Sequence, residues 1–180
     1  MYPQYNSKKS AHTAMEFIRL AGGRLDVLSL LKFMYLADRA SFEQFGYPIT
    51  YDRYFSLPFG PIPSQVYDNT KGVVRRDDHF WERLIVREEG NSLSVREYED
   101  PVSLSEINLT IIRETFRVHR PYIGGQFIDH VHEICPEWED PNGSSKPISV
   151  ESILRAVGVS EESTQHILDN MTERALLEAL

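Results

Sequence analysis

Two histidines and the only cysteine of the chain lie within six residues, in the stretch HVHEIC at 130–135. Imidazole and thiolate groups are common zinc ligands, and His119 lies upstream as a further candidate. The flanking pattern predicts a helix, on which residues two positions apart point in directions about 200° apart, so His130 and His132 would face away from each other. Structural zinc also usually takes two or more cysteines, and Cys135 is alone. We therefore predict no metal and no other cofactor.

Nucleophilic and phosphate chemistry have no motif in this sequence. The sequence contains no G-x-S-x-G nucleophile elbow, no G-x-x-x-x-G-K-[ST] phosphate loop and no H-E-x-x-H zinc motif, and Cys135 has no signature around it. We predict that the chain has no catalytic residues and is a binding protein, not an enzyme. A metal-dependent enzyme around His130, His132 and Cys135 remains the least favoured alternative.

Asp38 is a carboxylate on the apolar side of a predicted helix at 26–45, together with Val27 and Met34. An unpaired carboxylate there would cost several kcal/mol. Asp38 should therefore accept hydrogen bonds from backbone amides or pair with an arginine, for which Arg53 is the candidate nearest in sequence. Because no complementary acid, base or nucleophile accompanies it, we interpret Asp38 as a structural anchor.

The helix at 26–45 is apolar on nearly every side, which places it in the centre of the domain with other helices around it. Gly46 supplies a left-handed stop. The predicted polar stripe is narrow and consists of Asp26, Ser29, Lys32, Arg39 and Glu43.

The segment Phe59-Gly60-Pro61-Ile62-Pro63 is predicted to be a rigid loop. Each proline restricts φ to about −65°, and Gly60 permits a conformation or a close approach that a side chain would block. A rigid loop loses little entropy on binding and would serve as a recognition edge. The alternative is a loop that only closes the sheet onto the core.

The remaining elements follow from periodicity and from caps. We predict one domain over 1–180, mainly α (α+β), in which a compact helical domain surrounds the central apolar helix and carries a small antiparallel sheet or hairpin. The predicted helices are 11–22 capped by Ser10, 63–71, about 106–118 with a capping box at 103–106, 123–133, 149–156, and 161–180 capped by Ser160. The predicted extended segments are 49–57, 81–86 and 92–98, with a turn at 88–91 and a surface loop at 137–147.

The charge balance bears on the choice of partner. With 19 basic and 27 acidic side chains the net charge is −8, which disfavours direct binding to nucleic acid and fits a basic protein partner. The basic pairs Lys8-Lys9 and Arg75-Arg76 are interpreted as solvated surface. No apolar run reaches the roughly 18 to 20 residues that span a bilayer, and the N-terminus does not resemble a secretory signal. These features and the single cysteine predict a cytoplasmic protein with no membrane contact.

Motifs in a fixed order point to a family. The stretch KFMYLADRASFEQFGYPITYDRYFSLPFGPIPSQVYD, then FIDHVHEICPEWEDP and PISVESILRAVG, resembles the SocA-like antitoxins, also called the Panacea domain, which occur in many phage-associated proteins. The similarity covers about 14–158. A second block, His132 with Pro136-Glu137-Trp138, is similar to one branch of the family.

The resemblance implies a mostly helical domain with a small antiparallel sheet, acting as the antitoxin of a type II-like toxin-antitoxin system. Its partner would be a cognate protein toxin encoded nearby, neutralised by direct contact. A second mode implied by the family is a proteolytic adaptor that delivers the toxin to the ClpXP protease. An orphan phage or prophage interaction protein without a toxin is the main alternative.

We hypothesise that the central helix holds the loop at 59–63 and the aromatic strand around Tyr54 rigid, so that they present a preformed surface to the toxin. Aromatic anchors dominate many such interfaces. The predicted partner-binding residues are Arg53, Tyr54, Phe59, Gly60, Pro61, Tyr67 and Trp138. His132, interpreted as a packed and hydrogen-bonded histidine, joins Asp38 as a predicted structural anchor.

Overall fold

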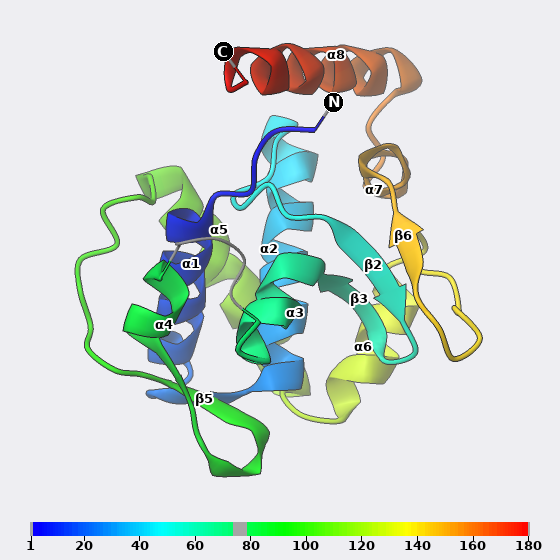
Figure 1. Cartoon of the computed structure of the whole chain (residues 1–180). Helices are drawn as coiled ribbons and strands as arrows, with labels where there is room; N and C mark the ends of the chain where they lie inside the picture. Colours follow the sequence, from blue (N-terminus) through cyan, green and yellow to red (C-terminus); the bar gives the residue numbers. More distant parts are fainter. Residues whose placement is uncertain (1, 74–78, 180) are drawn as a thin grey trace.

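A single helix, α2 (Val27–Phe45), runs through the middle of the molecule, and the other elements surround it (Figure 1). The computed structural model describes residues 2–73 and 79–179, so the predicted basic pair Arg75-Arg76 lies outside the described residues. The Asp26 side chain caps α2, and Gly46 ends it in the left-handed conformation with φ of 74°. The predicted helix and its stop are confirmed.

Helices flank α2 on several sides. Their bounds are α1 (Ser7–Leu20), α3 (Ser64–Thr70), α4 (Phe80–Leu84), α5 (Glu106–His119), α6 (Gln126–Ile134), α7 (Val150–Ala156) and α8 (Glu161–Leu177), with short 3-10 turns η1 (Glu89–Asn91) and η2 (Arg120–Tyr122). The Phe33 ring of α2 is the centre of an aromatic cluster that joins α1, α5 and α6. Its centroid lies 5.1 Å from that of Phe17, 5.2 Å from that of Phe116 and 4.9 Å from that of Phe127. The fold is mainly α, as predicted.

The polar stripe predicted along α2 is wrong for Ser29 and Lys32, which are completely buried. The Ser29 hydroxyl accepts a hydrogen bond from the Gly124 N–H at 2.9 Å. The Lys32 ammonium nitrogen donates to the Pro61 carbonyl at 3.0 Å, and burial lowers the pKa of Lys32 to about 7. Later segments of the chain, around Pro61 and Gly124, therefore cover a surface that helical periodicity alone assigned to solvent.

Two helix starts differ from the prediction. Asn6, not Ser10, caps α1, and Ser10 is buried inside that helix. Ser105 and Asn108 form the capping box of α5. The predicted box at 103–106 is therefore shifted by two residues. The Asn108 side chain accepts the hydrogen bond from the Ser105 N–H that a glutamate side chain was expected to accept.

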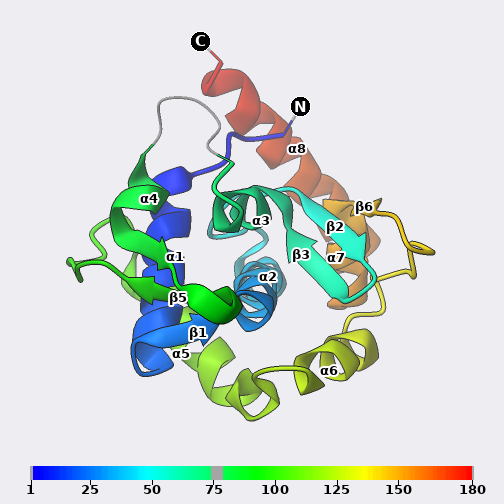
Figure 2. The same cartoon turned by 60° about the horizontal axis from the view of Figure 1, so that its bottom comes forward.

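Two three-stranded antiparallel sheets lie on opposite sides of α2 (Figure 2). The first has the order β1 (Arg24–Asp26), β5 (Ser92–Val95), β4 (Ile85–Arg87), and the second has the order β3 (Gly60–Pro63), β2 (Tyr54–Leu57), β6 (Lys146–Ile148). The hairpin joined at 88–91 is confirmed. The predicted strand at 81–86 is wrong in its first half, because a helical turn places Trp81 and Leu84 on one buried side.

The predicted loop at 59–63 is mostly strand. Residues 60–63 pair with β2 from Leu57↔Gly60 onward, so only Pro58 and Phe59 form the turn. Gly60 has φ of 101°, and a Cβ atom there would lie 2.6 Å from a methyl group of Val131. This position therefore requires glycine both for its backbone conformation and for the close approach of α6.

The C-terminal helix α8 lies next to the N-terminal segment (Figure 1). The backbone N–H of Gln4 donates to the Glu178 carboxylate at 2.9 Å, and the Arg174 guanidinium donates to the Tyr51 hydroxyl at 2.7 Å. The predicted cap Ser160 is confirmed, and Ser149, predicted as the first residue of the helix at 149–156, is the residue that caps α7. Within the described residues, no helix combines the length and the hydropathy needed to cross a bilayer.

Candidate functional site

Asp38 ties the central helix to the chain that follows it. Its carboxylate accepts hydrogen bonds from the backbone amides of Ile49 at 2.8 Å and Thr50 at 3.1 Å, and from the Tyr54 hydroxyl at 2.9 Å. Burial raises the pKa of Asp38, and these hydrogen bonds oppose the rise. Of the two arrangements expected for this carboxylate, pairing with backbone amides is correct and pairing with Arg53 is wrong, since Arg53 points to solvent.

Asp52 is a second buried carboxylate, and the sequence analysis did not identify it. Its oxygens accept hydrogen bonds from the backbone N–H of Gln65 at 2.9 Å and of Val66 at 3.0 Å, so it caps the first turn of α3. Burial raises the Asp52 pKa to about 7 against the effect of these amides. No local pattern indicates this cap, because the aspartate lies far upstream of the helix start.

The side chains of β2 alternate between two environments. Tyr54 and Ser56 are buried, and the Tyr54 ring packs edge-on against Tyr35 and Phe42. Phe55, between them, is half-buried. This alternation is the period of two of a strand that is covered on one face.

Three of the residues predicted to contact a partner are therefore inside the protein. Tyr54, Gly60 and Pro61 are buried. Their side chains are not available to a partner in this structure, because one face of the sheet packs on α2 and α6. They support the neighbouring surface.

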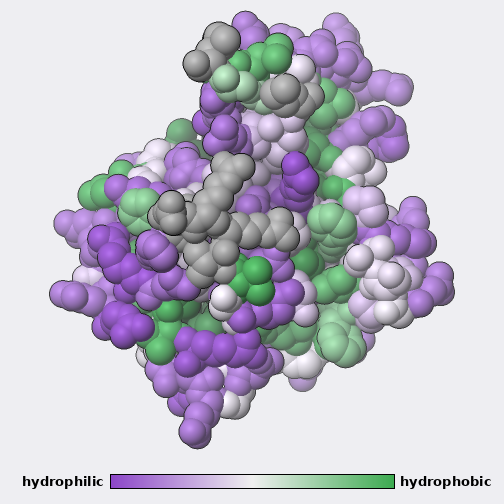
Figure 3. Space-filling model, in the orientation of Figure 1, coloured by the Kyte–Doolittle hydropathy of each residue, from purple (hydrophilic) through white to green (hydrophobic). Residues whose placement is uncertain are grey.

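The outer face of β2 forms one wall of an open groove of about 870 Å³. The N-terminal segment at 2–7 and helix α3 supply the other walls. In the space-filling view of this side of the molecule, hydrophobic surface extends down from α8 across the region of β2 and β3 (Figure 3). The groove lining is rich in aromatic and apolar side chains, among them Tyr2, Tyr5, Tyr51, Phe55, Leu57 and Tyr67.

Two of the predicted partner-binding residues, Arg53 and Tyr67, lie together in this groove. Asp68, also in the lining, pairs with Lys71 at 3.1 Å, and the Lys71 ammonium lies 4.1 Å from the centre of the Tyr67 ring. Within residues 2–73 and 79–179, the guanidinium group of Arg53 forms no hydrogen bond or ion pair.

The N-terminal wall was missed by the sequence analysis. The Tyr2 hydroxyl donates to the Asp52 carbonyl at 2.9 Å, and the Asn6 N–H donates to the Thr50 carbonyl at 2.8 Å. These bonds hold an extended segment beside β2. Its tyrosines were visible in the sequence, but no short-range pattern shows which distant strand they pack against.

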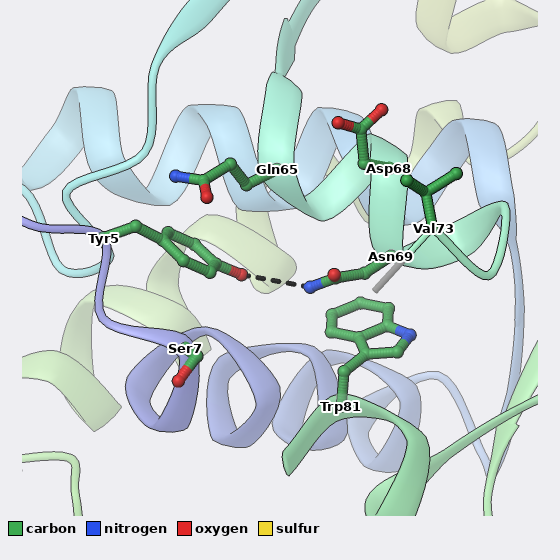
Figure 4. Close-up of a pocket in the computed structure, with 7 residues that line it drawn as sticks. All are labelled: Tyr5, Ser7, Gln65, Asp68, Asn69, Val73 and Trp81. Atoms are coloured by element: carbon green, nitrogen blue, oxygen red, sulfur yellow. Dashed lines mark hydrogen bonds between the residues drawn. The ribbon is translucent and has the colours of Figure 1, made fainter. Parts of the chain in front are cut away.

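A small cleft continues from the groove between α1 and α3 (Figure 4). Its volume is about 40 Å³, room for a water molecule but not for a cofactor. The amide of Asn69 donates to the Tyr5 hydroxyl at 3.2 Å, and Trp81 lies at the α4 end of the cleft. The cleft therefore extends the groove without adding a site for a larger group.

The second sequence block is fastened to the sheet from its other side. The Trp138 indole donates to the Leu57 carbonyl at 2.9 Å and stacks on His132 with ring centroids 3.8 Å apart. Arg39 and Glu137 form an ion pair at 2.7 Å. His132 is packed as predicted, but its buried Nε2 atom has no hydrogen-bond partner among the described residues, so the expected hydrogen bond is absent at that atom.

Phe59, another of the predicted contact residues, is largely exposed. It lies in the turn of the β2–β3 hairpin, and 63% of its surface is accessible. Trp138, by contrast, is half-buried. Neither of them lines the groove, so the predicted surface divides into the groove itself and the hairpin tip beside it.

The family model for the SocA-like antitoxin, Panacea domain, matches residues 30–139. The chain belongs to this antitoxin family. The match covers α2, the β2–β3 hairpin, α3 and the Trp138 block, but not the N-terminal wall of the groove or helices α7 and α8. Searches of curated proteins and of solved structures found no match.

The Panacea domain places the histidines of α6 in separate surroundings. The rings of His130 and His119 share a hydrogen bond at 2.8 Å, and His130 stacks on Tyr122 at 3.6 Å. Burial, together with the charge of His130, lowers the pKa of His119 to about 4. His132 instead faces Trp138, so the two α6 histidines point apart, as helical spacing predicts.

Cys135 is completely buried, and burial raises its pKa to about 12, which leaves the thiol protonated and unreactive at neutral pH. Among the described residues, no group of three or more metal-binding side chains is close enough to hold an ion. The SocA-like family suggests a non-enzymatic role for the chain.

Proposed function

We propose that this chain is the antitoxin of a type II-like toxin-antitoxin system and neutralises a cognate toxin, encoded nearby, by direct protein contact. The observation that carries the proposal is the open aromatic groove beside β2 in a chain of the SocA-like antitoxin family. Aromatic side chains in a groove give large contact areas at a low entropic cost. The groove is of the size of a ligand pocket, about 300–1,000 Å³.

The rigidity of the groove supports a protein-binding role. Its β2 wall is paired with strands on both sides, and its α3 wall is capped by Asp52. A surface that is already ordered loses little conformational entropy when it binds. The net charge of −8 disfavours a nucleic acid as the occupant.

We assign contact with the toxin to Arg53 and Tyr67 in the groove and to Phe59 at the hairpin tip. Trp138 lies at the border of this surface, where it holds the Leu57 backbone. In this proposal Tyr54, Gly60 and Pro61 support the surface from below. The structural anchors are Asp38 and His132, and no residue has a catalytic role.

The proposal also includes the adaptor mode, in which the antitoxin delivers its toxin to ClpXP. An adaptor needs a second surface in addition to its toxin site. The exposed Leu176 and Leu177 of α8 supply apolar area outside the groove. We further propose that residues 1–180 form one domain and act in the cytoplasm, where a free buried cysteine remains reduced.

A neutralisation assay tests the proposal. The reading frame adjacent to this gene is expressed from an inducible promoter, with and without this chain, and surviving colonies are counted. We expect the neighbour to be toxic alone, survival to be restored by this chain, and the two proteins to purify together. A harmless neighbour would favour the orphan interaction protein, and rescue without a complex would contradict direct neutralisation.

A further inference from the structure

We infer that the groove recognises an extended segment of the partner protein that places an Asp or Glu side chain against Arg53 and apolar side chains against Phe55 and Leu57. This inference rests on the proposed function only for the identity of the partner as a toxin. The three groove residues are two positions apart, Phe55 and Leu57 on one face of β2 and Arg53 directly before the strand. The segment therefore carries the acid at one end of an acid-x-apolar-x-apolar pattern.

Arg53 supplies the positive charge of the groove lining. Several other arginines of the described chain form ion pairs, for example Arg39 with Glu137, Arg155 with Glu151 and Arg174 with Glu178. Arg53 is exposed and lines the groove, and it has no partner within the described residues. A guanidinium group is a rigid fork of donors that matches a carboxylate with two parallel hydrogen bonds.

The carboxylates near Arg53 already have other partners. Asp52 precedes Arg53 directly, but its oxygens accept the amides of α3. Asp38 faces the amides at 49–50, and Asp68 pairs with Lys71. An external carboxylate is therefore the complementary charge for this cation in a chain whose net charge is −8.

The groove follows strand β2. Arg53, Phe55 and Leu57 all line it, and they are alternate residues of β2 and the position directly before it. Side chains on one face of a strand repeat every ~6.6–6.8 Å, the same repeat as in an extended peptide. A segment that lies along β2 therefore meets the charge and then the two apolar side chains in register.

The sheet offers no free backbone edge at β2. β2 is the central strand of its sheet, with β3 on one side and β6 on the other. Its backbone groups are paired, so the segment cannot bind as an added strand at β2. Recognition therefore depends on side chains, and loss of the Arg53 charge should have a large effect on affinity.

The test is a selection from a random 12-residue peptide library, displayed without a free C-terminal carboxylate, against the whole chain. We expect enriched peptides to carry Asp or Glu two positions from an apolar residue. Synthetic amidated versions should bind Arg53→Gln at least tenfold more weakly than the unchanged protein, by fluorescence anisotropy. A peptide with the Asp→Asn change should bind the unchanged protein more weakly by the same factor. Its affinity for Arg53→Gln should be no lower than its affinity for the unchanged protein.

Arg113→Gln is the matched control, because Arg113 is an exposed arginine on α5, outside the groove, with no partner among the described residues. It should bind the peptide with unchanged affinity, and thermal melting should show that Arg53→Gln folds normally. Enriched peptides without an acid, equal affinity for Arg53→Gln, or no enrichment would each overturn the inference. If the true occupant is a small molecule, the selection should give no enrichment.

The selection uses no toxin, so its outcome is separate from that of the neutralisation assay. If the neighbouring protein is harmless but the selected peptides depend on their acid, the inferred groove chemistry stands and the toxin as partner is rejected. If this chain rescues growth and co-purifies with the toxin but the selected peptides do not depend on an acid, the antitoxin function stands and the role of Arg53 is rejected.

Discussion

The two faces of strand β2 differ in what they contact. On the inner face, the Tyr54 hydroxyl donates to the buried Asp38 and the Ser56 hydroxyl accepts the Glu139 N–H. On the outer face, Phe55 and Leu57 line an open groove, with Arg53 beside them. A single short strand therefore joins a hydrogen-bonded interior to an exposed surface. The comparison predicts that inner changes alter stability and outer changes alter binding.

The largest loss of stability is expected for Asp38→Ala. The substitution leaves the buried amides of Ile49 and Thr50 and the Tyr54 hydroxyl without their acceptor. We expect the free energy of unfolding to fall by about 3–5 kcal/mol, measured by urea denaturation. The conservative variant Asp38→Asn, which keeps one acceptor oxygen, should lose less. A change below about 1 kcal/mol in Asp38→Ala would contradict the anchor role.

Lys32, beneath the sheet, should make stability depend on pH. Its pKa is lowered to about 7 in the folded chain and is about 10.4 when unfolded. Between these values the unfolded state holds the proton and the folded state does not, so stability rises with pH. From pH 7 to 9.5 the rise should be about 3 kcal/mol larger than in Lys32→Met, measured by denaturation at each pH. If the unfolding free energies of the unchanged chain and of Lys32→Met change in parallel with pH, Lys32 stays charged in the folded chain.

Tyr54→Phe removes one hydroxyl from the inner face. We expect a loss of about 1–2 kcal/mol, because the hydroxyl donates to a buried carboxylate. Tyr67→Phe is the matched change on the groove side and should alter stability by less than about 0.5 kcal/mol. Equal losses in the two variants would remove the distinction between the inner face and the groove.

The smallest effect on stability is expected for Phe59→Ala and Tyr67→Ala. Phe59 is largely exposed and Tyr67 is half-buried, so the melting temperature should stay within a few degrees of that of the unchanged chain. Partner binding, measured by co-purification and titration, should weaken at least tenfold for each. A collapse of stability would show that both residues belong to the core.

Elements with a local cause were predictable from the sequence. The helix at 26–45 with its Gly46 stop, the hairpin at 85–95 and the cap Ser160 each depend on neighbours within a few residues. The burial of Lys32 was not predictable, because the strand that covers it comes much later in the chain. Helical periodicity assigns a lysine to solvent unless that partner is known.

The candidate site was predicted only in part, for the same reason. Arg53 and Tyr67 were expected at the surface and do line the groove. The N-terminal wall and the Asp52 cap depend on contacts between distant segments, such as that of Tyr2 with the Asp52 carbonyl. Tyr54 was placed on the wrong face, because an aromatic residue in a short strand fits either side until the register is known.

The alternation along β2 also bears on how such a protein can diverge. A substitution at 53, 55 or 57 changes the groove and leaves the bonds of Asp38 intact. A lineage can therefore acquire a new partner through single steps that each preserve a foldable chain. Residues 53, 55 and 57 can change and alter which partner the groove binds. The inward-facing residues between them, such as Tyr54, limit that change because the fold depends on their bonds.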